Sequence, residues 1–311
     1  MKGNHSSFQK AGAWIKRNAR PLEAALWEYK FENGSAVRVM EYLSAFQNKD
    51  GGFGHGIEPD CWLPHSSPVA TWAAGRVLLE IKADPNENIV KSLLDYLTST
   101  PQIEPGMWPT VLPENNEYPH APWWTWKEGV QENWMFNPSA ELAALLIIWS
   151  NEQSRASQLG WSSLEKAVAY LMNCPEMDMH EISNFRMLHR LMKTRENHYN
   201  SRMKYTLDEV QERIISLVEK CVDRDISNWS KEYTALPLNF IDGPDDPLCF
   251  KLGTLVEENL RFYVKQMTDH GIWDISWEWG SYPEEFAVAR NYWKGILAIE
   301  RYSKMKSFGW L

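Results

Sequence analysis

The sequence predicts an all-α fold, a single α/α toroid of about six helical hairpins that spans residues 1–311. Three observations lead to this prediction. Amphipathic and uniformly apolar helical segments alternate along the chain, convincing β-strand alternation is absent, and a short glycine-containing motif recurs. No linker divides the 311 residues, and a hydrophobic share of 44% supplies material for one core.

Outer, half-exposed helices are predicted where an apolar stripe faces a charged one. In residues 206–221 apolar side chains recur every three or four positions, and Thr206 with Glu209 predicts a capping box. Further capping boxes are predicted at Ser162 and at Thr254. The predicted outer helices are residues 7–19, 35–47, 86–97, 162–172, 206–221 and 254–267.

Inner helices are predicted where a segment is apolar nearly all round and must be buried on every side. Two of them begin with a capping residue followed by proline, at Ser67-Pro68 and at Asn137-Pro138. Polar residues in 180–193 fit a core poorly, and Pro237 interrupts 229–240. The predicted inner helices are residues 21–31, 67–81, 137–149, 180–193, 229–240 and 284–301.

An internal repeat supports the toroid. The segment QNKDGGFG, which begins at Gln47, aligns with QMTDHGIW, which begins at Gln266, and the two share Gln, Asp and Gly. Gly75 and Gly295, on the helices that follow, lie 28 and 29 residues after the respective Gln. A third and weaker copy is predicted at Gly106.

Composition narrows the classes of partner and the compartment. A net charge of −9 gives a surface field that repels nucleic acid, so we expect no nucleic-acid partner. The first 19 residues contain no uninterrupted apolar stretch, which predicts neither a signal peptide nor a membrane span. The 4 cysteines show no C-x-x-C spacing, as is typical of reduced thiols, and the sequence therefore predicts a cytoplasmic protein.

Three long connections, residues 48–66, 98–136 and 268–283, lead from a predicted outer helix to an inner one. In a toroid all of them emerge at the same end, so we expect their residues to gather around one cavity mouth. The N-termini of the inner helices point to that mouth and would favour an anion there.

The first long connection presents His55, Glu58 and Asp60 within a glycine-rich segment. His55 is a predicted substrate-binding residue. Glu58 and Asp60 are predicted catalytic residues that could act as general acid and base, or could cap helices and form salt bridges instead. With Cys61 they could also hold zinc, but the spacing matches no strong zinc pattern, and we expect no metal and no cofactor.

Carboxylates and tryptophans alternate in the last long connection, where Asp274 and Glu278 are further predicted catalytic residues. The rings there could line a pocket or plug the end of the toroid. The second long connection is predicted to form a lid or a cavity wall. The predicted substrate-binding residues of these two connections are Trp108, His120, Trp123, Trp124, Trp273 and Trp277. The segment IDGPDD, residues 241–246, is predicted to be a solvated turn.

At QNKDGGFG followed by an apolar helix, the sequence resembles the QW-type repeats of squalene and oxidosqualene cyclases and the GGF turns of protein prenyltransferase β-subunits. The resemblance covers mainly residues 37–81 and 260–301 and implies an α/α toroid with a hydrophobic central cavity. The chain departs from both families. It lacks the Asp-x-Asp-Asp acid motif of class II cyclases, and Asp60 directly precedes Cys61, whereas the prenyltransferase zinc pair is spaced Asp-x-Cys.

Three functions are compatible with these residues. The first is a terpenoid-cyclase-like or prenyltransferase-like enzyme in which Asp60 or Asp274 protonates or orients an isoprenoid and Trp rings stabilise the developing cation. The second is a saccharide-active hydrolase or lyase that pairs Glu58 or Asp60 with Asp274 or Glu278. The third is a toroid that binds a ligand without catalysis. In the first two, the expected partner is a small hydrophobic or saccharide substrate.

Overall fold

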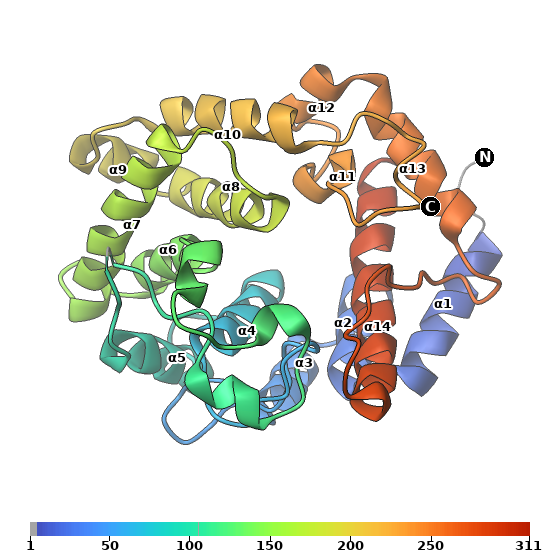
Figure 1. The fold of residues 1–311 in the computed structure, drawn as a ribbon, viewed down its shortest axis with the longest axis horizontal. Helices are drawn as coiled ribbons and strands as arrows, with labels where there is room; N and C mark the ends of the chain where they lie inside the picture. The colour runs from blue at the N-terminus through green and yellow to red at the C-terminus, as the bar shows by residue number, and fades with distance from the viewer. Residues whose placement is uncertain (1–4, 105) are drawn as a thin grey trace. The chain divides into compact units, whose positions relative to one another are not determined.

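The computed structural model describes residues 5–104 and 106–311, which form fourteen α-helices and three short 3-10 helices (Figure 1). Over these residues the loops form isolated β-bridges but no β-strand, which confirms the all-α prediction. None of the described helices is both long and apolar enough to cross a membrane. Residues 1–4, from the N-terminal segment predicted to carry no leader, and Pro105 of the second long connection lie outside the described residues.

The described helices divide into two compact units. The unit Phe46–Cys221 contains α4 (Pro68–Glu80), α5 (Asn88–Ser99), α6 (Ser139–Trp149), α7 (Arg155–Asn173), α8 (Met179–Lys193), α9 (Glu196–Arg202) and α10 (Leu207–Cys221), with 3-10 helices at Pro113–Glu117, Pro122–Trp124 and Val130–Asn133. The second unit combines the residues up to Ala45 with Val222–Leu311. It contains α1 (His5–Asn18), α2 (Pro21–Phe31), α3 (Ala36–Ser44), α11 (Pro237–Phe240), α12 (Pro247–Leu252), α13 (Thr254–Gln266) and α14 (Pro283–Ser307).

The unit 46–221 has two layers of helices, with α4, α6 and α8 packed in succession in one layer and α5, α7 and α10 in the other (Figure 1). Nearly every residue of α6 is buried, whereas α10 buries one stripe that includes Val210 and Ile214. The predicted difference in burial is therefore confirmed for these two helices. Glu141 on α6 is fully buried, and its charge is balanced by Arg76 of α4 through contacts of 2.8–3.1 Å.

Glycines allow two close helix contacts in this unit. A Cβ atom at Gly75 on α4 would lie 2.6 Å from a methyl carbon of Leu145 on α6. A Cβ atom at Gly160 on α7 would lie 2.8 Å from the carbonyl oxygen of Ala143. Any larger residue at either glycine would push apart helices that are packed at the density of a protein interior.

In the second unit α14 packs against both α1 and α2, and α2 also packs against α3. An aromatic cluster holds the first and last helices together. The ring of Trp27 lies 4.9 Å from that of Phe8 and 5.5 Å from that of Tyr302. Gly295 on α14 faces Ala19, and a Cβ atom there would lie 2.9 Å from the Ala19 methyl. The helices at the two ends of the chain therefore share one core.

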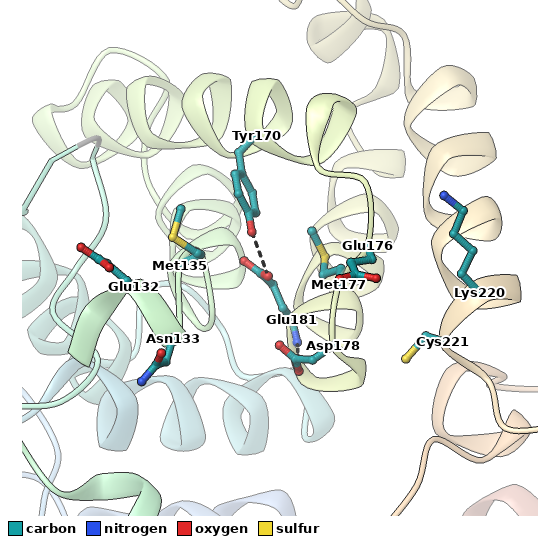
Figure 2. Close-up of a pocket in the computed structure, with 10 residues that line it drawn as sticks. All are labelled: Glu132, Asn133, Met135, Tyr170, Glu176, Met177, Asp178, Glu181, Lys220 and Cys221. Carbon is teal, nitrogen blue, oxygen red and sulfur yellow. Dashed lines mark hydrogen bonds between the residues drawn. The ribbon is translucent and has the colours of Figure 1, made fainter. Parts of the chain in front are cut away.

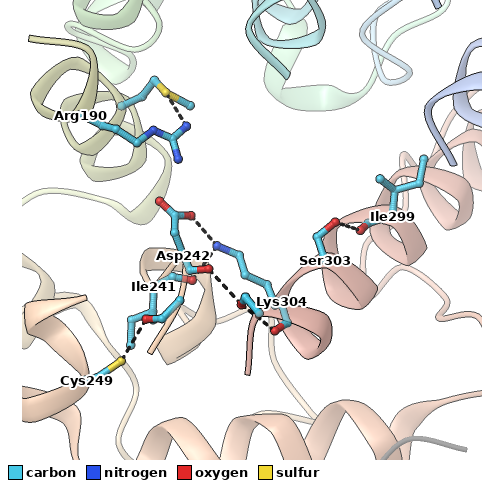
Figure 3. Close-up of polar contacts among 10 residues, drawn as sticks. Arg190, Ile241, Asp242, Cys249, Ile299, Ser303 and Lys304 are labelled. Atoms are coloured by element: carbon cyan, nitrogen blue, oxygen red, sulfur yellow. Dashed lines mark hydrogen bonds and ion pairs between the residues drawn. The ribbon is translucent and has the colours of Figure 1, made fainter. Parts of the chain in front are cut away.

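The segment 241–246 is a turn, as predicted, and Asp246 caps α12 by accepting a 3.0 Å bond from the Leu248 amide. The Lys304 ammonium on α14 donates to the Ile241 carbonyl and to the Asp242 carboxylate, each at 2.6 Å (Figure 3). Asp246 therefore serves as a helix cap and Asp242 as an ion-pair partner.

Three connections contain the same turn. The amides of Asn48, Ile103 and Thr268 each donate to the carbonyl four residues later, at 2.7–2.9 Å. In all three turns the residue three positions after the starting residue is a glycine with positive φ. The amide of this glycine donates to the carbonyl of the starting residue. The fifth residue after each starting residue is a fully buried aromatic. These glycines and aromatics are Gly51, Gly106, Gly271, Phe53, Trp108 and Trp273.

The turn geometry corrects the register of the predicted repeat by one residue. Gly271 is equivalent to Gly51, because both donate to the first residue of the turn, and not to Gly52 as the sequence alignment predicts. In the corrected register Gly75 and Gly295 lie at equal spacing, 27 residues after Asn48 and Thr268 respectively. The weaker copy at Gly106 is a third instance of the turn.

The largest error in the helix prediction is at residues 229–240, where only Pro237–Phe240 is helical. Aspartate side chains hold the residues just before this segment in turns. Asp223 accepts from the Asp225 amide and Asp225 accepts from the Ser227 amide, both at 2.9 Å. Such local bonds compete with helix formation, and Pro237 adds a break.

Three predicted helix starts are also wrong. Helix α7 begins seven residues before Ser162, because Ser154 caps it by accepting from the Ser157 amide at 3.1 Å. Gly253 and not Thr254 precedes α13, and Pro138 precedes α6 instead of starting it. The predicted capping box at Thr206 is confirmed, with reciprocal bonds to Glu209 of 2.7 and 3.2 Å.

Candidate functional site

The first two long connections meet in the unit 46–221. An isolated bridge pairs Cys61 with His120, the Trp62 amide donates to the Pro119 carbonyl at 3.0 Å, and the Ala121 amide donates to the Asp60 carbonyl at 2.8 Å. We call residues 58–62 and 119–121 the paired loops. The structure thus brings Glu58, Asp60 and His120, predicted from two separate connections, onto adjacent backbone.

The glycine-rich sequence before Glu58 explains how the first loop folds back. At Gly54 a Cβ atom would lie 2.4 Å from the carbonyl oxygens of Pro64 and His65, so only glycine permits this approach. His55 has a positive φ of 56°, its amide donates to the Leu63 carbonyl, and its ring bonds to Asn48 at 2.9 Å. The exposed His55 ring therefore helps to hold the loop in place through its bond to Asn48.

The two predicted carboxylates of this loop are buried, with exposed fractions of 8% for Glu58 and 3% for Asp60. The Glu58 carboxylate accepts from the Asp60 amide at 3.2 Å. Burial, with the nearby Glu58 and Asp60 charges, raises the pKa of the Cys61 thiol to about 12, so this thiol is neutral at physiological pH. A search of residues 5–104 and 106–311 finds no group of three or more His, Cys, Asp or Glu side chains placed to hold a metal ion.

On the second loop His120 is buried and fixed at both ring nitrogens. Nδ1 lies 2.6 Å from the Tyr118 carbonyl oxygen, which can only accept, so Nδ1 carries the proton. Nε2 lies 3.1 Å from the Thr125 hydroxyl and accepts from it. The Trp124 ring is buried and stacks on Trp134 with centroids 4.5 Å apart. The Trp123 ring is 37% exposed and is open to a ligand.

Two of the predicted substrate-binding rings are packing residues. Trp108 and Trp273 are fully buried, and their indole N–H groups donate to the carbonyls of Leu97 and Tyr263 at 3.0 and 2.7 Å. Both are the aromatic residues of the repeated turn, so their rings anchor that turn and present no open surface to a substrate.

The predicted residues of the last long connection belong to the second unit. The Asp274 carboxylate forms a bidentate ion pair with Arg290, at 2.8 and 2.5 Å, and contacts Lys294 at 3.5 Å. Burial acts to raise the pKa of Asp274, but these cations outweigh it and hold the pKa below its ordinary value. Asp274 is therefore suited to act as a carboxylate and poorly suited to donate a proton. Glu278 is exposed, and Trp277 packs edge-on against Trp293.

A pocket that the sequence did not predict lies in the unit 46–221, with a volume of about 410 Å³ (Figure 2). Its wall includes Glu181 of α8, which is only 4% exposed. Burial, which outweighs a 2.9 Å hydrogen bond from the Phe136 amide, raises the pKa of Glu181 to about 7. The sequence signal for this pocket was that polar residues in 180–193 fit a core poorly. The structure explains these residues, because α8 borders the pocket.

Comparison of the chain with protein-family models, with curated proteins and with solved structures finds no match.

Proposed function

We propose that the chain is a single α/α toroid of six hairpins, formed by α1–α2, α3–α4, α5–α6, α7–α8, α10–α11 and α13–α14. The repeated turn supports this arrangement. Each turn glycine packs against the outer helix of the following hairpin, with Gly51 against α5, Gly106 against α7 and Gly271 against the Ser7 carbonyl of α1. A closed ring of hairpins would place α1 directly after α13–α14, and these contacts agree with that order.

Glycines on the inner helices also pack against the inner helix of the next hairpin. Gly75 on α4 packs against α6 of the next hairpin, and Gly295 on α14 packs against Glu23 of α2 and the residue Ala19 just before that helix. A closed toroid predicts one compact particle in solution. Small-angle X-ray scattering should give a radius of gyration of about 19 Å, as expected for a 311-residue globule. A clearly larger value would contradict the closed ring.

We propose further that the protein is a terpenoid-cyclase-like enzyme that acts on an isoprenoid at the paired loops, with Asp60 as the acid. The observation that carries this proposal is the burial of Asp60 and Glu58 beside a thiol whose pKa is raised to about 12 by loss of hydration. Carbocation chemistry needs such exclusion of water, because water would trap the cation.

The proposed reaction starts when the protonated Asp60 carboxyl gives its proton to one carbon of an alkene. The alkene π electrons form the new C–H bond and leave a cation on the neighbouring carbon, which the next double bond of the same chain attacks. Loss of a proton to a carboxylate, for which Glu58 is the nearest candidate, restores neutrality. Aromatic rings such as Trp123 stabilise the intermediate charge.

The test is incubation of the purified protein with squalene, farnesyl diphosphate and geranylgeraniol, followed by gas chromatography and mass spectrometry. We expect a cyclised product from the wild-type protein and none from Asp60→Asn. The matched control is Asp95→Asn, an exposed aspartate on α5, which should keep full activity. Absence of both product and prenyl binding, or equal turnover by the two variants, would contradict the proposal.

A second candidate is a saccharide-active enzyme. It is favoured by two exposed rings next to the paired loops, Trp123 at 37% and Trp126 at 38%, because exposed aromatic rings stack on sugar faces. Here Asp60 and Glu58, which lie on the same loop, would be the acid and the carboxylate partner. Release of reducing ends from an oligosaccharide panel, lost in Asp60→Asn, would establish this candidate. Tight binding of either ligand class without product would indicate a non-catalytic toroid.

A further inference from the structure

We propose that the pocket between α7, α8 and the end of α10 binds a small organic cation, such as an amine, with Glu181 as its counter-ion. The pocket is lined by none of the paired-loop residues, and the proposal does not depend on the activity assigned to those loops. Its volume of about 410 Å³ is in the range of small-molecule sites, roughly 300–1,000 Å³.

The charges around the pocket favour a cation. Glu132, Glu176 and Asp178 line it with exposed carboxylates, and Glu181 lies deeper and buried. The basic residue among the described lining residues is Lys220, whose ammonium already donates to the Pro175 carbonyl at 2.9 Å. Four carboxyl groups against one engaged ammonium would repel an anion and attract a cation.

Each oxygen of the buried Glu181 carboxyl has one donor, and the donor to Oε2 is distant. Oε1 accepts a 2.9 Å bond from the Phe136 amide. Oε2 faces the Tyr170 hydroxyl at 3.4 Å, longer than the roughly 2.5–3.0 Å of an ordinary O–H···O bond (Figure 2). A charged N–H group in the pocket would give Oε2 a second and closer donor, and bonds between two charged groups are among the strongest in proteins.

The remaining lining suits the carbon part of an organic cation better than a bare metal ion. The Tyr170 ring offers a face for a cation, and the thioethers of Met135 and Met177 add polarizable apolar surface. Across the part of the chain that the structure describes, no three metal-ligating side chains lie close enough together to hold an ion. The pocket therefore combines a buried counter-charge with room for alkyl groups.

Protonation of Glu181 should control this binding. Burial raises its pKa to about 7, with Asp178 raising it further and the Phe136 amide and the Tyr170 hydroxyl lowering it. On the facing helices, burial raises the pKa of the Cys221 thiol to about 11 and raises the pKa of Tyr170, so both stay neutral near pH 7. A cation binds the ionised carboxyl, so its affinity should rise about tenfold from pH 6 to pH 8, in proportion to the ionised fraction.

The probes are choline, putrescine and agmatine, measured by isothermal titration calorimetry with the full chain. The neutral control is 3,3-dimethylbutan-1-ol, which has the shape of choline without its charge. We expect at least one cation to bind with one-to-one stoichiometry at pH 8 and about tenfold more weakly at pH 6. The neutral control should not bind.

Glu181→Gln should abolish this binding and its pH dependence, while Glu212→Gln, the same change at an exposed position on α10, should alter neither. Tyr170→Phe keeps the ring but removes a hydroxyl that lowers the Glu181 pKa, so its binding midpoint should move to higher pH. Circular dichroism checks that each variant is folded. The proposal is overturned if all three cations fail to bind at millimolar concentration, if the neutral control binds as well, or if folded Glu181→Gln keeps wild-type affinity.

Discussion

The free energy of unfolding should depend on pH through the buried carboxyl of Glu181, and Glu181→Gln should remove that dependence. Folding raises the pKa of this group from its ordinary value of 4.5 to about 7, chiefly by burial. An acid whose pKa is higher in the folded state holds more protons when folded than when unfolded between these two values. Its contribution to stability is therefore present below pH 4.5 and is lost as the pH rises to about 7.

The size of the effect follows from the pKa difference. Each pKa unit corresponds to about 1.4 kcal/mol, so wild-type stability should fall by about 2 to 3 kcal/mol between pH 5 and pH 8 through this one group. Glutamine has nearly the same shape, can accept the Phe136 amide bond and carries no charge. Relative to the wild-type protein, Glu181→Gln should therefore be near neutral at pH 5 and more stable by about 2 to 3 kcal/mol at pH 8.

Urea unfolding followed by tryptophan fluorescence at several pH values between 5 and 8 measures this difference. Glu212→Gln, an exposed residue of the same unit, controls for the change in net charge and should follow the wild-type curve. A difference between Glu181→Gln and wild type that stays constant over the whole pH range would contradict a raised pKa of Glu181 in the folded protein. It would mean that Glu181 is ionised throughout or is hydrated in the folded protein.

The remaining predictions concern the repeated turn, a helix cap and an ion pair. Gly51→Ala should lower the free energy of unfolding by more than about 3 kcal/mol, because the φ of Gly51 is 89° and the new Cβ would lie 2.1 Å from a carbonyl oxygen of α5. Gly129 also has a positive φ, of 78°, but has open space around it, so Gly129→Ala should lower the free energy of unfolding by only about 1–2 kcal/mol. Thr206→Ala removes a reciprocal cap and should cost about 1 kcal/mol in urea unfolding, whereas Thr254→Ala should cost clearly less, since Thr254 does not cap α13. Arg290→Gln removes the bidentate partner of Asp274, so the pKa of Asp274 should rise, which carboxyl ¹³C NMR measures. An unchanged pKa would show that Lys294 and hydration alone keep the Asp274 carboxyl ionised.

Most of the helices could be predicted because hydrophobic periodicity reports directly which face is buried. Residues 21–31 and 206–221 are correct to within one residue, and the capping box at Thr206 forms as the spacing indicates. The error at 229–240 has the opposite origin. There the apolar residues suggest a helix, but Asp223 and Asp225 bind the amides of residues 225 and 227 and hold the preceding segment in turns. Hydrophobic periodicity does not report such local bonds.

The site was predictable only in part. The toroid geometry predicted that all three long connections gather at one end, and for the first two the pairing of Cys61 with His120 agrees. Burial could not be read from the sequence. Trp108 and Trp273 are fully enclosed although they stand in the same kind of segment as the exposed Trp123. Glu181 could not be predicted as a site residue, because its raised pKa results from burial and from contacts with Tyr170 of α7 and the Phe136 amide, which are distant in sequence.

A product assay with wild-type protein, Asp60→Asn and Asp95→Asn on the same isoprenoid substrates decides whether Asp60 is the acid of a terpenoid-cyclase-like enzyme. We expect a cyclised product from the wild type and from Asp95→Asn, and none from a folded Asp60→Asn protein. Equal product from Asp60→Asn and Asp95→Asn, or reducing ends released from oligosaccharides with no isoprenoid turnover, would contradict it.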